Sequence, residues 1–209
     1  MIYLNGSAVL MDTLNIENSG YMITPNRHEY VEVYGIAWGA DTGCFTQPHT
    51  FSMSRYIDWL TDRKYAQDSC LFATAPDVVG DAVATLEISR EPLQEIRGLG
   101  YKSALVAQDG LENLDVPWDT FDCLFIGGTT EWKLSEHAYA LTEEAKRRGK
   151  WAHMGRVNSF RRIMAATISG YDSVDGTFLA YGPDLNIIRL KSWLDKLNKQ
   201  PSLLRRTYE

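Results

Sequence analysis

The stretch Trp151–Thr177, WAHMGRVNSFRRIMAATISGYDSVDGT, predicts a strand, a turn, a helix and a second strand. The apolar run Trp151–Met154 is the first strand. Asn158 or Ser159 can cap the helix that follows, because each side chain can accept a backbone N–H and the next apolar residues fall at helical spacing. Gly170 ends this helix. A unit of this kind is typical of a parallel sheet covered by helices.

Asp175 follows the second strand of this stretch, Tyr171–Val174. A buried strand that leads into Asp-Gly-Thr places a carboxylate at the edge of a sheet, where loops begin. Taken alone, an aspartate before a glycine is more typical of a turn. A chemical role for Asp175 therefore depends on whether other strands bring reactive groups to the same edge.

Helical patterns alternate with apolar runs through most of the chain. Asp81 is expected to cap one of these helices, and Pro92 to bend or split it. We expect helices over Met53–Arg63, Asp81–Ile96, Leu134–Arg148 and Asn186–Leu197.

Eight predicted strands, most of the later ones followed by helices, indicate an α/β fold. We predict a compact (β/α)8 TIM barrel that forms a single domain over residues 1–209. An open doubly wound sheet is the alternative, and both folds bind ligands at the carboxyl ends of their strands. The strands expected outside the opening stretch are Met1–Leu4, Tyr21–Thr24, Val31–Trp38, Cys70–Ala75, Ser103–Ala107 and Cys123–Ile126.

The composition is ordinary for a globular domain, with 209 residues of which 44% are hydrophobic and 23% charged. The chain has no run of 18 apolar residues and no signal-peptide pattern, so we expect no membrane partner and a cytoplasmic location. The three cysteines share no CxxC spacing, and no two of the four histidines have metal-ligand spacing. We therefore expect neither a disulfide framework nor a zinc site.

The net charge of −6 argues against a general nucleic-acid binder, but the charge is unevenly distributed. From Thr142 onward, 13 Lys and Arg residues stand against 7 Asp and Glu residues. Such a cluster is more often a solvated helix face than a phosphate-contacting surface, and both interpretations stay open. The basic residues close together in this part of the chain are Lys146, Arg147, Arg148, Lys150, Arg156, Arg161 and Arg162.

Carboxylates, an amide, glycines, an aromatic ring and a thioether follow the predicted strands. This set suits a flat, nitrogen-rich heterocycle, because the carboxylate and the amide can bond to ring edges while Phe45 and Met154 cover the two ring faces. Two further carboxylates remain for acid–base or nucleophilic work. The residues are Asp41, Thr42, Gly43, Phe45, Asp77, Gln108, Gly127, Gly128, Met154, Gly155 and Asp175.

Sequence motifs of other catalytic classes are missing from the chain. It contains no GxSxG and no GxxxxGK[ST] motif. Gly98-Leu99-Gly100 precedes a predicted strand instead of following one, so it does not match a dinucleotide-binding loop.

The order of these residues resembles that of the tRNA-guanine transglycosylase family, which includes relatives that insert 7-deazaguanines into phage and bacterial DNA. Asp41-Thr42-Gly43-Cys44-Phe45 is similar to the family's Asp-Ser-Gly-Gly-Tyr segment, with phenylalanine at the ring position. Gly170-Tyr171-Asp172-Ser173-Val174-Asp175 is similar to its Gly-x-Asp-x-x-Asp segment. The family's base-reading aspartate and glutamine, its Gly-Gly pair and its Met-Gly pair are matched in order by Asp77, Gln108, Gly127-Gly128 and Met154-Gly155.

The resemblance, which covers about Ala37 to Thr177, implies base exchange through a covalent glycosyl-enzyme. It implies that Asp175 is the nucleophile and Asp41 the general acid and base, and that no metal or redox cofactor takes part. Asp81 competes with Asp77 as a base reader, and we favour Asp77 because it directly follows a strand. The other residues that the resemblance places around the base are Thr42, Phe45, Gln108, Gly127, Gly128, Met154 and Gly155.

The expected partners are a nucleic acid and a free 7-deazapurine base. Arg156, Arg161 and Arg162 lie next to the matched segments and could hold phosphates. The family's tRNA enzymes carry a cysteine-rich zinc site after the nucleophile, whereas no cysteine follows Cys123 here and the chain is far shorter. The smaller DNA-modifying relatives, many of them from phages, are therefore the closer likeness, which for a phage-encoded protein implies the host cytoplasm.

Three alternatives stay open. The substrate could be tRNA instead of DNA, or the same pocket could belong to an N-glycosidase that uses water as the acceptor. A non-catalytic base-binding barrel is the third. The oligomeric state is also open, with a homodimer among the states that the sequence allows.

Overall fold

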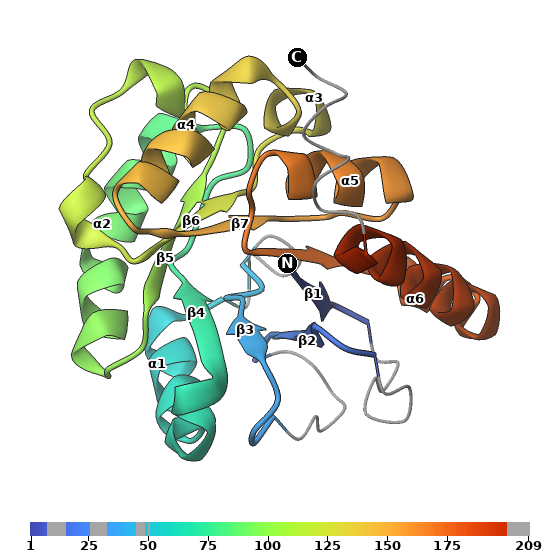
Figure 1. Cartoon of the computed structure of the whole chain (residues 1–209). Helices are drawn as coiled ribbons and strands as arrows, with labels where there is room; N and C mark the ends of the chain where they lie inside the picture. The colour runs from blue at the N-terminus through green and yellow to red at the C-terminus, as the bar shows by residue number, and fades with distance from the viewer. Residues whose placement is uncertain (8–15, 26–32, 45–48, 50, 200–209) are drawn as a thin grey trace.

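Eight parallel strands close into one barrel in the computed structural model, which describes residues 1–7, 16–25, 33–44, 49 and 51–199 (Figure 1). The ring closes where β1 pairs with β8, with Leu4 opposite Asp175. This closure confirms the (β/α)8 TIM barrel and excludes the open doubly wound sheet. The strands are β1 (Ile2–Asn5), β2 (Ser19–Ile23), β3 (Trp38–Ala40), β4 (Cys70–Thr74), β5 (Ser103–Ala107), β6 (Cys123–Ile126), β7 (Trp151–Met154) and β8 (Ser173–Gly176).

Helices pack around the outside of the ring (Figure 1). Asp81 caps α2 and Ser159 caps α5 by accepting backbone N–H groups, which decides between Asn158 and Ser159 as the α5 cap. The α-helices are α1 (Met53–Thr61), α2 (Ala82–Gly98), α3 (Thr130–Lys133), α4 (Glu136–Arg147), α5 (Phe160–Ile168) and α6 (Pro183–Lys199). Short 3₁₀ helices are η2 (Lys64–Ser69), η3 (Leu111–Asn113), η4 (Trp118–Thr120) and η5 (Phe178–Ala180).

Three predicted elements differ from the structure. Of the strand expected over Val31–Trp38, residues 31 and 32 lie outside the described residues, and β3 covers only Trp38–Ala40 because Gly35 adopts a left-handed φ of 72° in a turn just before it. The helix expected over Leu134–Arg148 is α4, Glu136–Arg147, which Ser135 caps, and the short helix α3 just before it was not predicted. Pro92 does not split α2, whose buried residues lie on both sides of the proline and hold the helix on the barrel despite one missing hydrogen bond.

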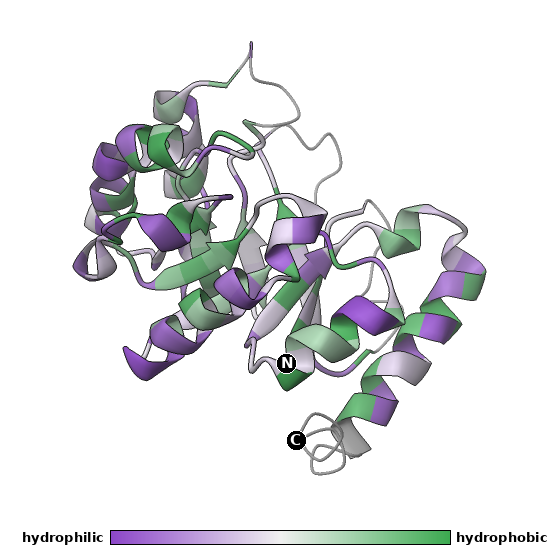
Figure 2. Ribbon diagram, turned by 90° about the horizontal axis from the view of Figure 1, so that it is seen from above, coloured by the Kyte–Doolittle hydropathy of each residue, from purple (hydrophilic) through white to green (hydrophobic). Residues whose placement is uncertain are grey.

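Side chains alternate between two apolar layers along each strand, as the two-residue period of a strand requires. In β6, Cys123 and Phe125 belong to the cluster inside the barrel, whereas Leu124 and Ile126 pack outward beneath the helices. In Figure 2, hydrophobic residues are prominent on the strands, and the surrounding helices carry both hydrophobic and hydrophilic residues. The barrel interior is therefore filled, and its carboxyl end carries the loops that can bind a ligand.

None of the helices that the structure describes is long and apolar enough to cross a membrane.

Candidate active site

The loops at the carboxyl ends of the strands surround a pocket of about 100 Å³. Asp41 and Asp175 both face this pocket, although 134 positions separate them in the sequence. The structure thus brings together the carboxylates that the sequence placed after different strands. The lining residues are Asp41, Thr74, Asp77, Val79, Val106, Gln108, Phe125, Gly127, Gly155, Arg156 and Asp175.

Asp41 is held at the end of β3 by its own turn. Its backbone N–H donates to the Ile23 carbonyl at 2.9 Å, and its Oδ1 accepts the Gly43 N–H at 3.0 Å. Burial raises the pKa of Asp41 to about 6, the Gly43 hydrogen bond opposes this rise, and the charges of Asp175 and Asp77 add to it. A carboxyl group with such a pKa can carry a proton near neutral pH, as a general acid must.

Asp77 and Gln108 form a hydrogen-bonded pair across the pocket. Gln108 Nε2 donates to Asp77 Oδ2 at 2.6 Å, and Gln108 Oε1 accepts the Gly80 N–H at 3.0 Å. Burial raises the pKa of Asp77, while a hydrogen bond from Cys44 and the charge of Arg156 oppose the rise. Asp81 is instead exposed and bonded to the Ala84 N–H at 2.9 Å as the cap of α2. Of these two aspartates, Asp77 is therefore the one that lines the pocket.

Asp175 lies within β8, and a histidine that the sequence analysis left without a role holds it. His153 Nε2 lies 3.0 Å from Asp175 Oδ1, and the His153 side chain is fully buried while that of Asp175 is 14% exposed. Burial lowers the pKa of His153, against the raising effect of Asp175. Alternation along β7 requires residues 153 and 154 to face opposite ways, but the sequence carries no signal for which of the two faces inward.

Glycine is required where strand ends approach the pocket. A Cβ at Gly127 would lie 2.7 Å from Val106 Cγ1 and 2.8 Å from Gln108 Nε2. A Cβ at Gly155 would lie 2.7 Å from Phe125 Cε1, on the apolar wall of the pocket. These two glycines therefore leave backbone atoms open to a ligand.

Gly128 and Arg156 form the outer edge of the pocket. Arg156 Nη2 donates to the Gly127 carbonyl at 3.1 Å and also to the Gly128 carbonyl. Gly128 itself is not among the lining residues, and a Cβ there would clash with the ring of Trp132. Its glycine thus serves the packing of α3, and its carbonyl fixes the guanidinium of Arg156.

Lys133 is a second residue that the sequence analysis missed. It is 2% exposed, and its Nζ donates to the Gly155 carbonyl at 2.7 Å. Burial and the charge of Arg156 lower its pKa to about 8, although Asp175 opposes the shift. The Lys133 ammonium group therefore contacts the backbone of Gly155, which lines the pocket, without lining the pocket itself.

Besides Gly128, two further predicted pocket residues lie elsewhere. Met154 faces outward into the layer between the barrel and the helices, because it alternates with the inward His153, so its predicted role in covering a ring face is wrong. Thr42 is buried, donates its N–H to Thr74 Oγ1 at 3.2 Å and lines a neighbouring cavity with Phe51. Phe45 lies outside the described residues.

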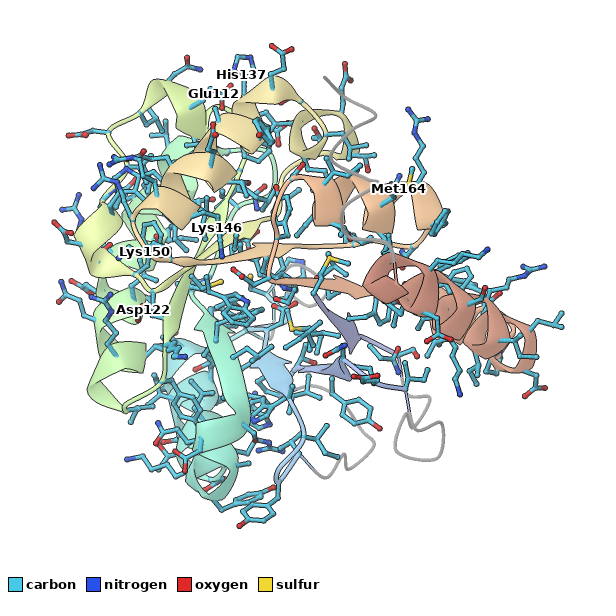
Figure 3. The ribbon with its side chains drawn as sticks, in the orientation of Figure 1. Glu112, Asp122, His137, Lys146, Lys150 and Met164 are labelled. Atoms are coloured by element: carbon cyan, nitrogen blue, oxygen red, sulfur yellow. The ribbon has the colours of Figure 1, made fainter. Side chains whose placement is uncertain are left out.

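The basic cluster of the sequence divides between the two ends of the barrel. Lys146 and Lys150 precede β7 (Figure 3). Lys146 bonds to Asp172, and Lys150 bonds to the Phe121 carbonyl. Arg147 and Arg148 pair with Glu144 on the same helix. These four residues are therefore a solvated face remote from the pocket. The remaining three, Arg156, Arg161 and Arg162, follow β7 at the pocket end.

No protein-family model matches the sequence, and no curated protein matches it. Among solved structures, one described as "Native KDPGal structure" is similar at 13% identity and a TM-score of 0.59, covering 96% of this chain and 94% of the other. The BexX/CysO complex of Amycolatopsis orientalis is similar at 12% identity and a TM-score of 0.59, covering 99% and 91%. A cube-shaped, highly porous protein cage follows at 12% identity and 0.56, covering 96% and 72%. At such identities these similarities establish the fold, a compact (β/α)8 barrel, and nothing further.

Proposed function

We propose that this protein is an enzyme, a transglycosylase that exchanges guanine for a 7-deazaguanine base in nucleic acid, with DNA as the favoured substrate. The observation that carries the proposal is the convergence of Asp41, Asp77, Gln108 and Asp175 on one pocket at the carboxyl end of the barrel. Two of these residues, Asp77 and Gln108, can bind a base. The other two, Asp41 and Asp175, can act on its glycosidic bond.

Base recognition is assigned to Asp77 and Gln108. The Asp77 carboxylate can accept hydrogen bonds from the N–H groups on one edge of guanine, and the Gln108 amide can donate to its carbonyl oxygen. In the free protein these side chains bond to each other at 2.6 Å, so each stays paired until a base replaces the contact. Val106 and Phe125 supply apolar surface beside them.

Base exchange is assigned to Asp175 and Asp41. An Asp175 oxygen attacks C1′ of the target nucleotide, the bond from C1′ to the base breaks, and Asp41 gives its proton to the departing guanine. The incoming deazapurine then loses a proton to Asp41 and attacks C1′, which releases Asp175. Two inversions retain the configuration at C1′, as in retaining glycosidases.

The target base must leave a double helix, or already be single-stranded, to reach the pocket. Arg161 is exposed and Arg162 is partly exposed, and both lie near the opening on α5. They are well placed to hold phosphates of the strand that carries the target base.

Asp77→Ala is expected to weaken binding of free deazapurine by about 1–3 kcal/mol, because the base then loses a buried hydrogen-bond partner. Isothermal titration calorimetry of the unsubstituted protein and of Asp77→Ala with the free base measures this change in affinity. Asp81→Ala is the matched control, since it removes a carboxylate four residues away that only caps α2. An equal loss of affinity in both variants would contradict the assignment of Asp77 as base reader.

Arg161→Ala and Arg162→Ala are each expected to reduce the slope of log K against log salt by roughly 0.7–0.9 for nucleic-acid binding. Arg156 is less suitable, because its guanidinium also holds the Gly127 and Gly128 carbonyls. Arg147→Ala, at the other end of the barrel, is the control and should leave the slope unchanged. An unchanged slope in both Arg161→Ala and Arg162→Ala would show that these arginines, like Arg147, belong to a solvated surface and do not contact phosphates.

The decisive experiment incubates the protein with a guanine-containing oligonucleotide, with and without a 7-deazaguanine base, and analyses the product nucleosides by mass spectrometry. Incorporation of the deazapurine supports the proposal. Release of guanine without an added base would favour an N-glycosidase instead. Parallel reactions with single-stranded DNA, duplex DNA and tRNA distinguish the substrates.

A further inference from the structure

A chain of hydrogen bonds runs through the barrel interior and ends at Asp175. Trp151 Nε1 donates to Ser173 Oγ at 2.8 Å, Ser173 Oγ lies 2.7 Å from His153 Nδ1, and His153 Nε2 lies 3.0 Å from Asp175 Oδ1. Ser173 and His153 are both fully buried. Asp175 is thus the member of this chain that reaches the pocket.

The direction of these bonds follows from the donor at the far end. An indole N–H can only donate, so Ser173 Oγ accepts from Trp151. If Ser173 Oγ also accepted from Nδ1 of a neutral imidazole, Nε2 would face the Asp175 carboxylate without a hydrogen, so the serine hydrogen is assigned to His153 Nδ1. An unprotonated Nδ1 places the proton of a neutral imidazole on Nε2, where it is donated to Asp175. An imidazolium would instead leave the Ser173 hydroxyl hydrogen without an acceptor among the described residues.

The imidazole ring is also fixed in orientation. Its centroid lies 4.7 Å from that of Phe72 and 4.5 Å from that of Phe125, inside the filled barrel. Ring rotation would break both nitrogen contacts while these phenylalanines resist the movement. His153 therefore presents one N–H in one direction.

We propose that His153 is the positioning residue for the nucleophile: its Nε2–H holds Asp175 Oδ1, so that Oδ2 is the oxygen presented to C1′. This inference rests on the proposed function. The charged and titratable groups that face Asp175 from other elements are Tyr3 on β1, Asp41 after β3, Lys133 on α3 and Arg156 after β7. His153, by contrast, contacts the Asp175 carboxylate directly through its Nε2–H.

Serine, histidine and aspartate also form the triad of many hydrolases, but the order here is reversed. In that triad the serine meets the substrate and the carboxylate lies behind the histidine. Here Ser173 is fully buried and accepts from Trp151, while the carboxylate faces the pocket. The group that this arrangement positions as a nucleophile is therefore the Asp175 carboxylate and not the Ser173 hydroxyl.

The hydrogen-bond direction can be tested without any assay of activity. We expect ¹⁵N NMR of the histidine-labelled protein to show His153 as the neutral tautomer with the proton on Nε2, from about pH 6 to 8. Ser173→Ala should lose this single tautomer, because Nδ1 then has no donor. A Nδ1–H tautomer or an imidazolium in the unsubstituted protein would overturn the inference.

The positioning role predicts a loss of rate without a loss of base affinity. We expect His153→Phe to slow formation of the covalent adduct about 10²-fold, since misplacing a reacting group by about 1 Å can cost that much. His153→Gln should stay within about tenfold of the unsubstituted protein, because its amide can donate to Asp175 and accept from Ser173. The affinity for free deazapurine should change less than about twofold in both variants.

Tyr171→Phe is the matched control, because it removes a buried hydrogen bond, 2.8 Å to Thr142, near the opposite end of β8. It should lower thermal stability without slowing adduct formation. An undiminished rate in His153→Phe, or a parallel loss of base affinity, would contradict the positioning role. If the unsubstituted protein forms no adduct, the proposed function fails, and the NMR result still confirms or overturns the bond from His153 to Asp175.

Discussion

Replacing Asp175 by asparagine is expected to abolish both base exchange and the covalent adduct, a loss on the order of 10⁴-fold or more, as when other enzymes lose their nucleophile. Attack on C1′ needs an ionised oxygen, and a neutral amide has none. The amide is nearly the same size, and its oxygen can still accept the His153 N–H that now lies 3.0 Å from Asp175 Oδ1. The pocket should therefore keep its shape and its affinity for free deazapurine.

A denaturing gel of the protein with a guanine-containing oligonucleotide shows the adduct directly. Asp172→Asn is the matched control, because that aspartate lies three residues earlier in the chain, bonded to Lys146 at the opposite end of β8. It should form adduct at the rate of the unsubstituted protein. If Asp175→Asn still traps the oligonucleotide while Asp41→Asn does not, the roles of nucleophile and proton donor have been exchanged.

The later strands of the barrel could be predicted from the sequence because each is a short apolar run bounded by turn residues. β5, β6 and β7 have the bounds expected from the sequence, and the residues that follow them meet at one pocket. Parallel strands bring their carboxyl ends to the same edge, so strand order alone places Asp77, Gln108 and Asp175 near one another. This rule needs no knowledge of the barrel's closure.

The inward and outward faces of the strands could not be predicted in the same way. Met154 was expected over the ligand and His153 was given no role, yet β7 turns the histidine inward and the methionine outward. Both residues lie in a run that is buried on two sides, so hydropathy does not distinguish its faces. The face is set by pairing with β6 and β8, which depends on residues far away in the sequence.

The β3 region shows a second limit. The sequence predicts an eight-residue strand over Val31–Trp38, but among the described residues the ladder pairs β3 only over Trp38–Ala40. Gly35 in its left-handed turn decides where extended backbone can begin. Val33 is nevertheless buried in the core outside any strand, whereas Tyr34 beside it is exposed.

Asp41 combines a chemical role with a cost in stability. Its folded-state pKa of about 6 is above its ordinary value of 3.8, so the folded protein binds the proton more tightly than the unfolded chain does. Stability contributed by this group is therefore present at low pH and lost as the pH rises from about 4 to 6, by about 3 kcal/mol at most. An asparagine at position 41 does not ionise, so the free energy of unfolding should not fall in this way as the pH rises.

Asp41→Asn is thus expected to slow base exchange by about 10²–10⁴-fold, the usual contribution of general acid–base catalysis, and yet to be the more stable protein at pH 7. Some adduct should still form, because Asp175 remains.

In the unsubstituted protein, adduct formation should fall as the pH rises above about 6, where Asp41 loses the proton that it gives to guanine. Asp41→Asn should show no such fall. Rapid-quench kinetics between about pH 5 and 8, with urea unfolding at pH 4 and 7, measure both effects, and a variant that keeps the same fall in rate would show that another group supplies the proton.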